Sequence, residues 1–163
     1  MGDRISVLRG GRLVGTIEPS LLHNTKNSEI QTMIIEMMFG EETEIADSVI
    51  EVSDKVTGRR VVKNFSEQPV LELKDITVEG KFDEVGVQGV SFSLHAGEIL
   101  GIAGVDGNGQ CELAEAIAGQ RKIVSGDILL NGSSVSRKSI LIRQNMGLRY
   151  VTDDRLGEGI CAP

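Results

Sequence analysis

A glycine-rich loop constrains this chain more than any other feature of its sequence. Residues 104–111 read GVDGNGQC, with an apolar segment at 99–103 before them and a helix-like segment at 112–118 after them. This strand–loop–helix context distinguishes a phosphate-binding loop, with the spacing G-x-x-x-x-G-K-[ST], from a chance group of glycines. The lysine and the hydroxyl residue of that pattern are absent. The sequence therefore predicts an α/β fold built around a phosphate loop that lacks its cation.

The residues that replace the missing ones weaken the expected chemistry. Gln110 occupies the lysine position, where it can donate hydrogen bonds but adds no charge. Cys111 occupies the position of the hydroxyl that ligates Mg²⁺, and sulfur is a poor ligand for that hard ion. Asp106 and Glu112 add negative charge close to the expected phosphates. We expect weak nucleotide binding and no efficient hydrolysis by this loop.

The loop residues are nevertheless the candidate nucleotide-binding site. Glycines and the start of a helix direct backbone N–H groups toward one point, which suits a phosphate. A dinucleotide-binding G-x-G-x-x-G pattern starting at Gly107 fits less well, because Glu112 would replace the glycine that allows close helix packing. The predicted binding residues in the loop are Gly104, Asp106, Gly107, Asn108, Gly109, Gln110 and Cys111.

Composition excludes several classes of protein. A net charge of −7 argues against nonspecific nucleic-acid binding, which needs a basic face. No apolar run is long enough to span a membrane, and the N-terminus lacks a signal-peptide pattern. Cys111 and Cys161 have no metal-site or disulfide spacing and are expected to be inert thiols. His23 and His95 lie in polar segments and are expected to face solvent rather than to act in catalysis.

The first forty residues predict a β-hairpin followed by a helix. Alternating apolar residues at 5–8 and 13–17 flank a Gly-Gly pair, which is typical of a hairpin turn. Ser28 and Gln31 form a capping-box pattern at the start of a helix that Gly40 ends. Met33 and Met37 on that helix are expected to be core residues. One hairpin and one helix bury too little surface to be stable alone.

The rest of the chain divides into a linker and an α/β block. Residues 41–69 are weakly patterned and predict a linker. Short strands at 49–52 and 61–62 are an alternative for parts of it. From residue 70 onward, strands and helices alternate, with some strands expected to be antiparallel. The expected strands are 70–78, 87–94, a buried strand at 98–103, 126–132 and 148–151, and the expected helices are 112–118 and 136–144.

Several of these segments resemble the sugar-type ATP-binding cassette (ABC) proteins, the ATPase subunits of bacterial importers for simple sugars and nucleosides. Residues 90–99 are similar to the family's lead-in to its phosphate loop, and residues 104–110 to the degenerate loop of its second nucleotide-binding domain. Residues 150–155 resemble a Tyr-Val-Pro-Glu-Asp-Arg segment, with Thr152 and Asp153 replacing Pro and Glu. Residues 3–12 and 28–40 resemble the end of the first domain, and Leu71 begins the similarity to the second.

The resemblance implies a fold, a set of site residues and a division of the chain. The fold is an incomplete P-loop NTPase core of the ABC cassette type with antiparallel β elements, preceded by the hairpin and helix. Residues 1–40 would end the first nucleotide-binding domain, 41–69 would be the linker, and 70–163 would be the N-terminal half of the second. Phe82 would stack on adenine, and Asp153 would lie near the Q-loop position, beside Asp154. No signature motif, Walker B strand or switch histidine follows Cys111, so we expect a fragment.

The resemblance also implies a cofactor, partners and a location. ATP would bind weakly or not at all to such a fragment, and Mg²⁺ would be bound only in the intact protein. The partners would be permease subunits of an inner-membrane importer and the other nucleotide-binding domain, and the protein would lie at the cytoplasmic face of the membrane. The fragment is expected not to hydrolyse ATP and to be prone to self-association. Two alternatives stay open: a noncatalytic interaction module derived from a P-loop domain, and an intact small NTPase of another kind.

Overall fold

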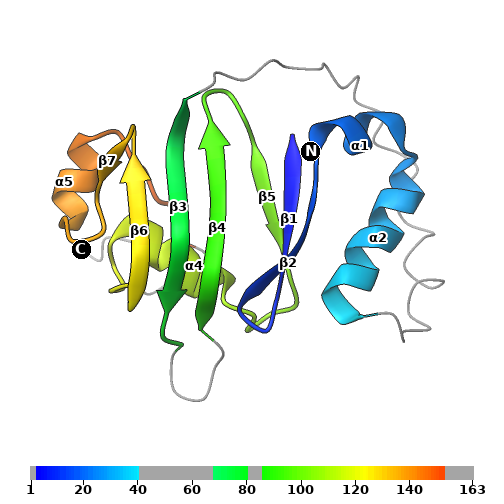
Figure 1. Ribbon diagram of the computed structural model, residues 1–163, viewed down its shortest axis with the longest axis horizontal. Helices are drawn as coiled ribbons and strands as arrows, with labels where there is room; N and C mark the ends of the chain where they lie inside the picture. Colours follow the sequence, from blue (N-terminus) through cyan, green and yellow to red (C-terminus); the bar gives the residue numbers. More distant parts are fainter. Residues whose placement is uncertain (1–2, 41–67, 81–85, 153–163) are drawn as a thin grey trace, which may run out of the picture.

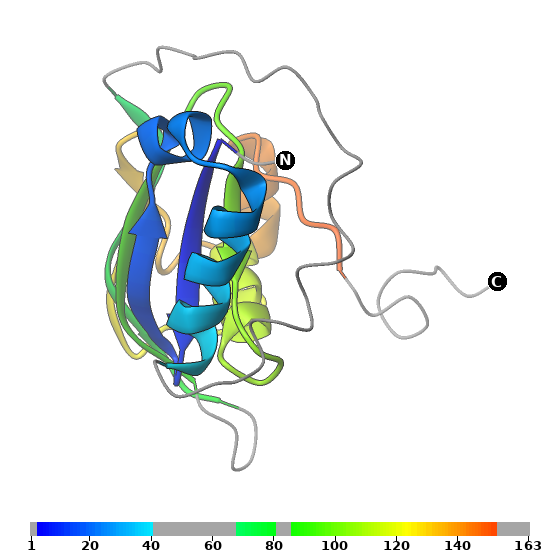
Figure 2. The ribbon, with the colours of Figure 1, turned by 90° about the vertical axis from the view of Figure 1, so that its right-hand side faces the viewer.

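The computed structural model describes residues 3–40, 68–80 and 86–152, and these form two sheets with helices packed on one side. One sheet has the strand order β2-β1-β5 and the other β4-β3-β6-β7. Figure 1 shows the two sheets side by side, with α4 behind β3 and β4. In Figure 2, α2 and α4 lie on the same side of the strands. The mixed α/β architecture expected from the sequence is confirmed.

The N-terminal hairpin and helix are present as the sequence predicts. Strands β1 (Arg4–Arg9) and β2 (Arg12–Ile17) are antiparallel. Gly10 and Gly11 take φ values of 56° and 72°, which the hairpin turn requires and glycine adopts without steric cost. Helix α2 (Asn27–Phe39) ends at Gly40, whose N–H donates to the carbonyl of Glu36. Helix α1 (Pro19–Asn24) precedes α2 and was not predicted.

The predicted capping box at Ser28 is wrong. Helix α2 already includes Asn27, its N-cap is Lys26, and no side chain caps it. The carbonyl of Ser28 instead accepts a hydrogen bond from the hydroxyl of Thr32 within the helix. The cause is α1, whose C-cap is Thr25, so that the extended pair 25–26 is the whole connection between the two helices.

The second block supplies the larger sheet and the strand that leads into the glycine loop. Its strands are β3 (Pro69–Val78), β4 (Val87–His95), β5 (Leu100–Ala103), β6 (Ser125–Leu130) and β7 (Ser133–Ser134). Its helices are α4 (Gln110–Ala118) and α5 (Ile140–Asn145). β3 pairs with β4 and β6, both antiparallel. The strand expected at 148–151 is wrong, because residues 148–152 form neither helix nor strand.

Parallel pairing of β1 with β5 joins the two blocks. Arg4 to Val7 lie in register with Leu100 to Ala103. A buried ion pair supports the pairing, with Arg4 Nε 2.9 Å from the Glu98 carboxylate. The predicted linker is not described beyond its last residues, so the division into domains at 41–69 stays a prediction. Within the described ranges, the hairpin is part of the sheet that carries the loop.

β5 is less buried than predicted. Ile99, just before it, is 58% exposed, and Ile102 within it is 38% exposed. Apolar parallel strands are normally covered on both faces. The cause is that β1 is the only strand paired with β5 among the described residues, at the end of its three-stranded sheet.

Two apolar clusters hold the structure together. The larger lies between α4 and the second sheet and includes Leu73, Ile76, Leu113 and Ile128, each at most 1% exposed. The smaller joins the hairpin to the helices through Ile17, Leu22 and Ile30, with Met33 and Met37 packed against it. The two methionines, predicted to be core residues, are thus half-buried and pack against the core rather than lying within it.

The carboxyl group of Asp127 in β6 makes the stability of the fold depend on pH. Its carboxylate accepts hydrogen bonds from the hydroxyls of Ser134 and Ser136, which hold its pKa below the ordinary value of 3.8. Because the folded state lowers the pKa of Asp127, the ionised carboxylate stabilises the fold at pH values above 3.8. This stabilisation is lost as the pH falls through the lower pKa of the folded state.

We therefore expect Asp127→Asn to lower the free energy of unfolding at neutral pH. The deficit should shrink as the pH falls below 3.8, because the wild-type carboxyl then becomes protonated as well. Urea unfolding between neutral pH and about pH 3 measures this. Ser134→Ala is the matched variant and should reduce the same pH dependence while keeping the carboxylate. A deficit independent of pH would show that the charge of Asp127 is not the cause.

Candidate functional site

The glycine loop lies where the sequence predicts, between β5 and α4. The C-terminal end of β5 is Ala103, and α4 begins at Gln110 with Gly109 as its N-cap. Gly107 and Gly109 have φ values of 77° and 99°, a region that strains any residue with a side chain. The loop is therefore a sharp strand-to-helix turn built on glycines, the geometry of a phosphate loop.

The loop closes around the carbonyl of Val105. The side-chain amides of Asn108 and Gln110 donate to it at 2.8 and 3.2 Å. The backbone N–H of Asn108 donates to it at 3.3 Å. A Cβ at Gly104 would lie 2.8 Å from the carbonyl of Leu8 and would also collide with the Gln110 side chain. Gln110 is thus folded over the start of the loop, and its amide is used internally.

The backbone donors of the loop are only partly committed. The N–H of Gly107 donates to the carboxylate of Asp106 at 3.0 Å, so this anion takes a donor that a phosphate would use. The N–H groups of Gly109 and Gln110 have no acceptor among the described residues. They lie at the N-terminal end of α4, where the helix dipole favours negative charge.

The N-terminal hairpin contacts the loop directly. The N–H of Gly10 donates to the side-chain oxygen of Asn108 at 2.7 Å. The next residue of the turn, Gly11, accepts a hydrogen bond from the N–H of Gln88 at 2.7 Å. Arg12 donates to the side chain of Gln88 at 3.0 and 3.1 Å. The hairpin turn therefore bridges the loop and β4, a contact that no local sequence pattern indicates.

The acidic residues near the loop differ in their surroundings. Asp106 is exposed, as is Cys111, which is not in a disulfide. Glu112 is buried, with its carboxylate 4.0 Å from the guanidinium of Arg121. Arg121 pairs more closely with Glu115, at 2.6 Å. The positive charge of Arg121 offsets part of the negative charge that the sequence led us to expect beside the phosphates.

The structure brings together some of the predicted site residues. Residues 104–111 form the loop and the first two residues of α4, and the other two candidates, Phe82 and Asp153, lie outside the described residues, as does Asp154. His95 is half-buried and lies 3.2 Å from the carboxylate of Glu98, so it is not simply solvent-facing. No group of three or more His, Cys, Asp or Glu side chains suited to a metal is found in the described part of the chain.

One feature that sequence reasoning missed is a basic cavity beside the C-terminal end of α4. Its lining comes from residues 119–126 and 136–143, which flank β6 and β7. The only sequence signal was a set of Lys and Arg residues at 121–122 and 137–138, separated by a strand and a turn.

Within 3–40, 68–80 and 86–152, no helix has the length and apolar character to cross a membrane.

Comparison with known proteins agrees with the geometry of the loop. Residues 87–157 match the family model described as ABC transporter. The chain is 33% identical over 162 residues to the nucleoside import ATP-binding protein NupA of Lactococcus lactis, covering 98% of this chain and 28% of that protein. It is 37% identical over 156 residues to the ribose import ATP-binding protein RbsA of Clostridium perfringens, covering 96% of this chain and 26% of that protein.

A third curated protein and one solved structure are also similar to this chain. The galactose/methyl galactoside import ATP-binding protein MglA of Haemophilus influenzae is 33% identical over 159 residues, covering 97% of this chain and 27% of that protein. A bacterial Atm1-family ABC exporter with ATP bound matches with a TM-score of 0.40 and 22% identity, over 66% of this chain and 18% of that one. The chain spans about a quarter of the length of its curated relatives. Residues 87–157 thus match the ABC transporter family model, in a chain that is similar over nearly all its length to sugar and nucleoside import ATP-binding proteins.

Proposed function

We propose that this chain is part of the ATP-binding, energy-coupling subunit of an importer for simple sugars or nucleosides. The names of its relatives, matched over 96% or more of this chain, support this function. In such a subunit, residues 1–40 end one nucleotide-binding domain and residues from 70 onward begin a second. The partners are the permease subunits and the other nucleotide-binding domain, at the cytoplasmic face of the membrane. ATP is the ligand, with Mg²⁺ bound by the assembled protein.

The phosphate loop of this chain serves as a weak or structural nucleotide site, and does not hydrolyse ATP. The observation that carries this proposal is the position of Gln110, whose neutral amide donates to Val105 inside the loop. Asp106 adds an anion to the same loop. Hydrolysis needs a cation that neutralises the charge of the transferring phosphate, and no Lys or Arg occurs between 104 and 111.

Restoring the cation tests the proposal. We expect Gln110→Lys to tighten ATP binding about 10-fold to 100-fold, because a charge-assisted hydrogen bond contributes roughly 1.5–3 kcal/mol and each 1.4 kcal/mol is about tenfold in affinity. Isothermal titration of the whole chain with ATP measures the change. Gln31→Lys is the matched control, because it adds the same charge on α2, far from the loop in sequence.

Two results would contradict the proposal. One is an equal gain in affinity in Gln31→Lys, since it would reflect net charge alone. The other is magnesium-dependent ATP turnover by the wild-type chain that disappears in Gly109→Ala. The second variant is specific to the loop, because Gly109 has a φ of 99° and its added Cβ would lie 3.2 Å from the carbonyl of Gly86.

A noncatalytic interaction module is the second candidate function. The hydrogen bond between Gly10 and Asn108 favours it, because the loop there holds two distant parts of the chain together. Under this function, ATP would leave the amide signals of Gly107 to Gln110 unchanged in both the wild type and Gln110→Lys. Amide shifts at those positions would favour the nucleotide site instead.

A further inference from the structure

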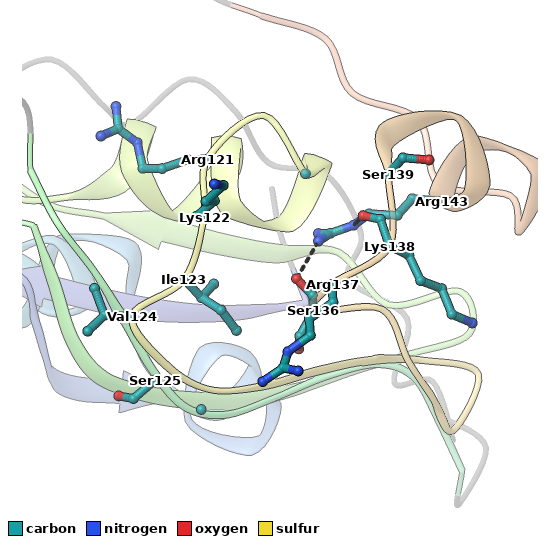
Figure 3. Close-up of a pocket in the computed structure, with 12 residues that line it drawn as sticks. Arg121, Lys122, Ile123, Val124, Ser125, Ser136, Arg137, Lys138, Ser139 and Arg143 are labelled. Carbon is teal, nitrogen blue, oxygen red and sulfur yellow. Dashed lines mark hydrogen bonds between the residues drawn. The ribbon is translucent and has the colours of Figure 1, made fainter.

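We propose that the cavity beside the C-terminal end of α4 binds a small phosphate-bearing anion. The cavity has a volume of about 550 Å³. Two segments line it, the connection from α4 to β6 and the segment that leads from β7 into α5 (Figure 3). This site is separate from the glycine loop, and it does not depend on the function proposed above.

The charge of the lining is opposite to that of the whole chain. The chain has 17 Lys and Arg residues against 24 Asp and Glu residues. The cavity, in contrast, is lined by Arg121, Lys122, Arg137, Lys138 and Arg143 and by no Asp or Glu. A concave surface with a single sign of charge concentrates counter-ions and focuses the field of its charges. The preferred occupant is therefore an anion.

Three of these cations are available to a ligand. Lys122, Arg137 and Lys138 have no carboxylate partner among the described residues. The ammonium of Lys138 makes a weak contact with the sulfur of Met146, at 3.9 Å. Arg121 is different, because its guanidinium is engaged by Glu115 and in Figure 3 it points away from Arg137 and Lys138. The free cations come from both lining segments, so an anion between them would contact each segment.

Arg143 adds a fixed positive charge to the wall of the cavity. Its side chain is 2% exposed and donates to the carbonyls of Ala116, Ile117, Lys138 and Ser136. Figure 3 shows the bond to the carbonyl of Ser136 as a dashed line. Carbonyl groups satisfy its hydrogen bonds without neutralising its charge, and burial lowers the pKa of this guanidinium. An anion in the cavity would therefore gain from a positive charge that no carboxylate of the described residues offsets.

Size and wall chemistry define the class of ligand. A volume near 550 Å³ is within the range of small-molecule sites and holds a phosphorylated sugar or a mononucleotide. Ser125 and Ser139 add exposed hydroxyls, and Ile123 and Val124 add apolar wall. Arginine and lysine together are the usual partners of phosphate oxygens. The shared chemistry is thus a phosphate group on a small organic body.

Titration with inorganic pyrophosphate tests the site in the whole chain. We expect amide signals of residues 122–125 and 137–139 to shift on addition of pyrophosphate, with weaker binding at higher salt. Arg137→Gln and Lys122→Gln should each weaken binding about tenfold, because each removes a charge-assisted hydrogen bond. Lys26→Gln is the matched control, an exposed cation at the start of α2, and should bind pyrophosphate like the wild type.

The outcomes separate this site from the others. Shifts confined to residues 104–110 would overturn the proposal, since they would place the anion in the glycine loop. An equal loss of binding in Lys26→Gln would also overturn it, because net charge would then explain the effect. Binding of a poly-glutamate peptide without any response to pyrophosphate would identify the surface as a protein contact instead.

Ligand variants identify the organic body. Ribose 5-phosphate and adenosine monophosphate are titrated against the same amide signals. If either binds more tightly than pyrophosphate and loses affinity in Arg137→Gln, the site takes that class of phosphate ester. If neither improves on pyrophosphate, the site takes the phosphate group alone. In both cases, the amide signals of residues 107–110 report separately on the function proposed for the loop.

Discussion

Replacing Arg143 with methionine is expected to lower the free energy of unfolding by about 2–4 kcal/mol. The guanidinium donates to the carbonyls of Ala116 and Ile117 in the last turn of α4, at 2.6 and 2.8 Å. The carbonyl of Ile117, in a part-buried bond, has no other donor among the described residues, and losing a hydrogen bond to a charged group costs about 1.5–3 kcal/mol. Loss of the positive charge beside the helix C-terminus adds a further ~0.3–1 kcal/mol. Urea unfolding at neutral pH measures the change.

The opposing effect in this variant is smaller. Methionine removes the cost of burying a charge, and buried ions are often replaced by apolar residues without loss. Here, however, the partners of the ion are four carbonyls in buried or part-buried bonds, and all of them lose a charged donor. Arg143→Lys separates the two contributions, because it keeps the charge but cannot span four carbonyls, and we expect an intermediate loss. A methionine variant as stable as the wild type would mean that the carbonyls find water or other donors.

Replacing Gly126 with alanine is expected to lower the free energy of unfolding by about 2–6 kcal/mol. Gly126, the second residue of β6, has a φ of 91°, which strains a side-chain-bearing residue by about 1–3 kcal/mol. A Cβ there would also lie within 3.0 Å of the backbone of Lys74 and Asp75. Asp75 itself has a φ of 52° at an irregularity in the pairing of β3 with β6. Backbone atoms on a paired strand cannot move aside cheaply, so overpacking adds about 1–3 kcal/mol.

Gly132 provides the control for this substitution. Its φ is 74°, close to that of Gly126, but nothing lies within 4 Å of an added Cβ. Gly132→Ala should therefore report the backbone strain alone and be clearly less destabilising. Urea unfolding of the two variants under the same conditions gives the contribution of the close approach to β3. Equal losses would show that the sheet rearranges to accept the methyl group.

The elements that the sequence predicted are those with local causes. The hairpin depends on Gly10 and Gly11 between alternating apolar residues, and it forms with these two glycines in the turn. Helix α4 follows a glycine loop and ends at Gly119, in the left-handed conformation expected of a C-cap. Each of these features is decided within about ten residues, so a reading of the sequence alone was sufficient.

The features that were wrongly predicted or not predicted from the sequence depend on residues elsewhere in the chain. The capping pattern at Ser28 was overridden by α1, and the predicted burial of β5 fails because β1 alone pairs with it in the described residues. Nothing near Arg4 indicates that it lies against Glu98, although that ion pair supports the β1–β5 register. Such contacts depend on tertiary packing, which periodicity and turn chemistry do not contain.

In the candidate site, too, the features with local causes were predictable from the sequence, and those that depend on tertiary packing were not. The position of the loop and the absence of its cation were readable from residues 104–111. The inward fold of Gln110 and the bond from Gly10 to Asn108 were not, because each requires the relative placement of side chain and backbone in space. The basic cavity was equally out of reach, because its cations are brought together only by the path of β6 and β7.

The pairing of β1 with β5 has a consequence for the order in which the chain folds. Two supporting hydrogen bonds join positions 96 and 98 residues apart: the N–H of Ile99 donates to the carboxylate of Asp3, and the N–H of Gly10 donates to the side-chain oxygen of Asn108. Closing so long a loop carries an entropic cost that nearby hairpins do not have, so these contacts form slowly. The β3–β4 ribbon and α4 can condense first through local contacts. The segment that carries the glycine loop is then set in its final position late, when the N-terminal hairpin docks.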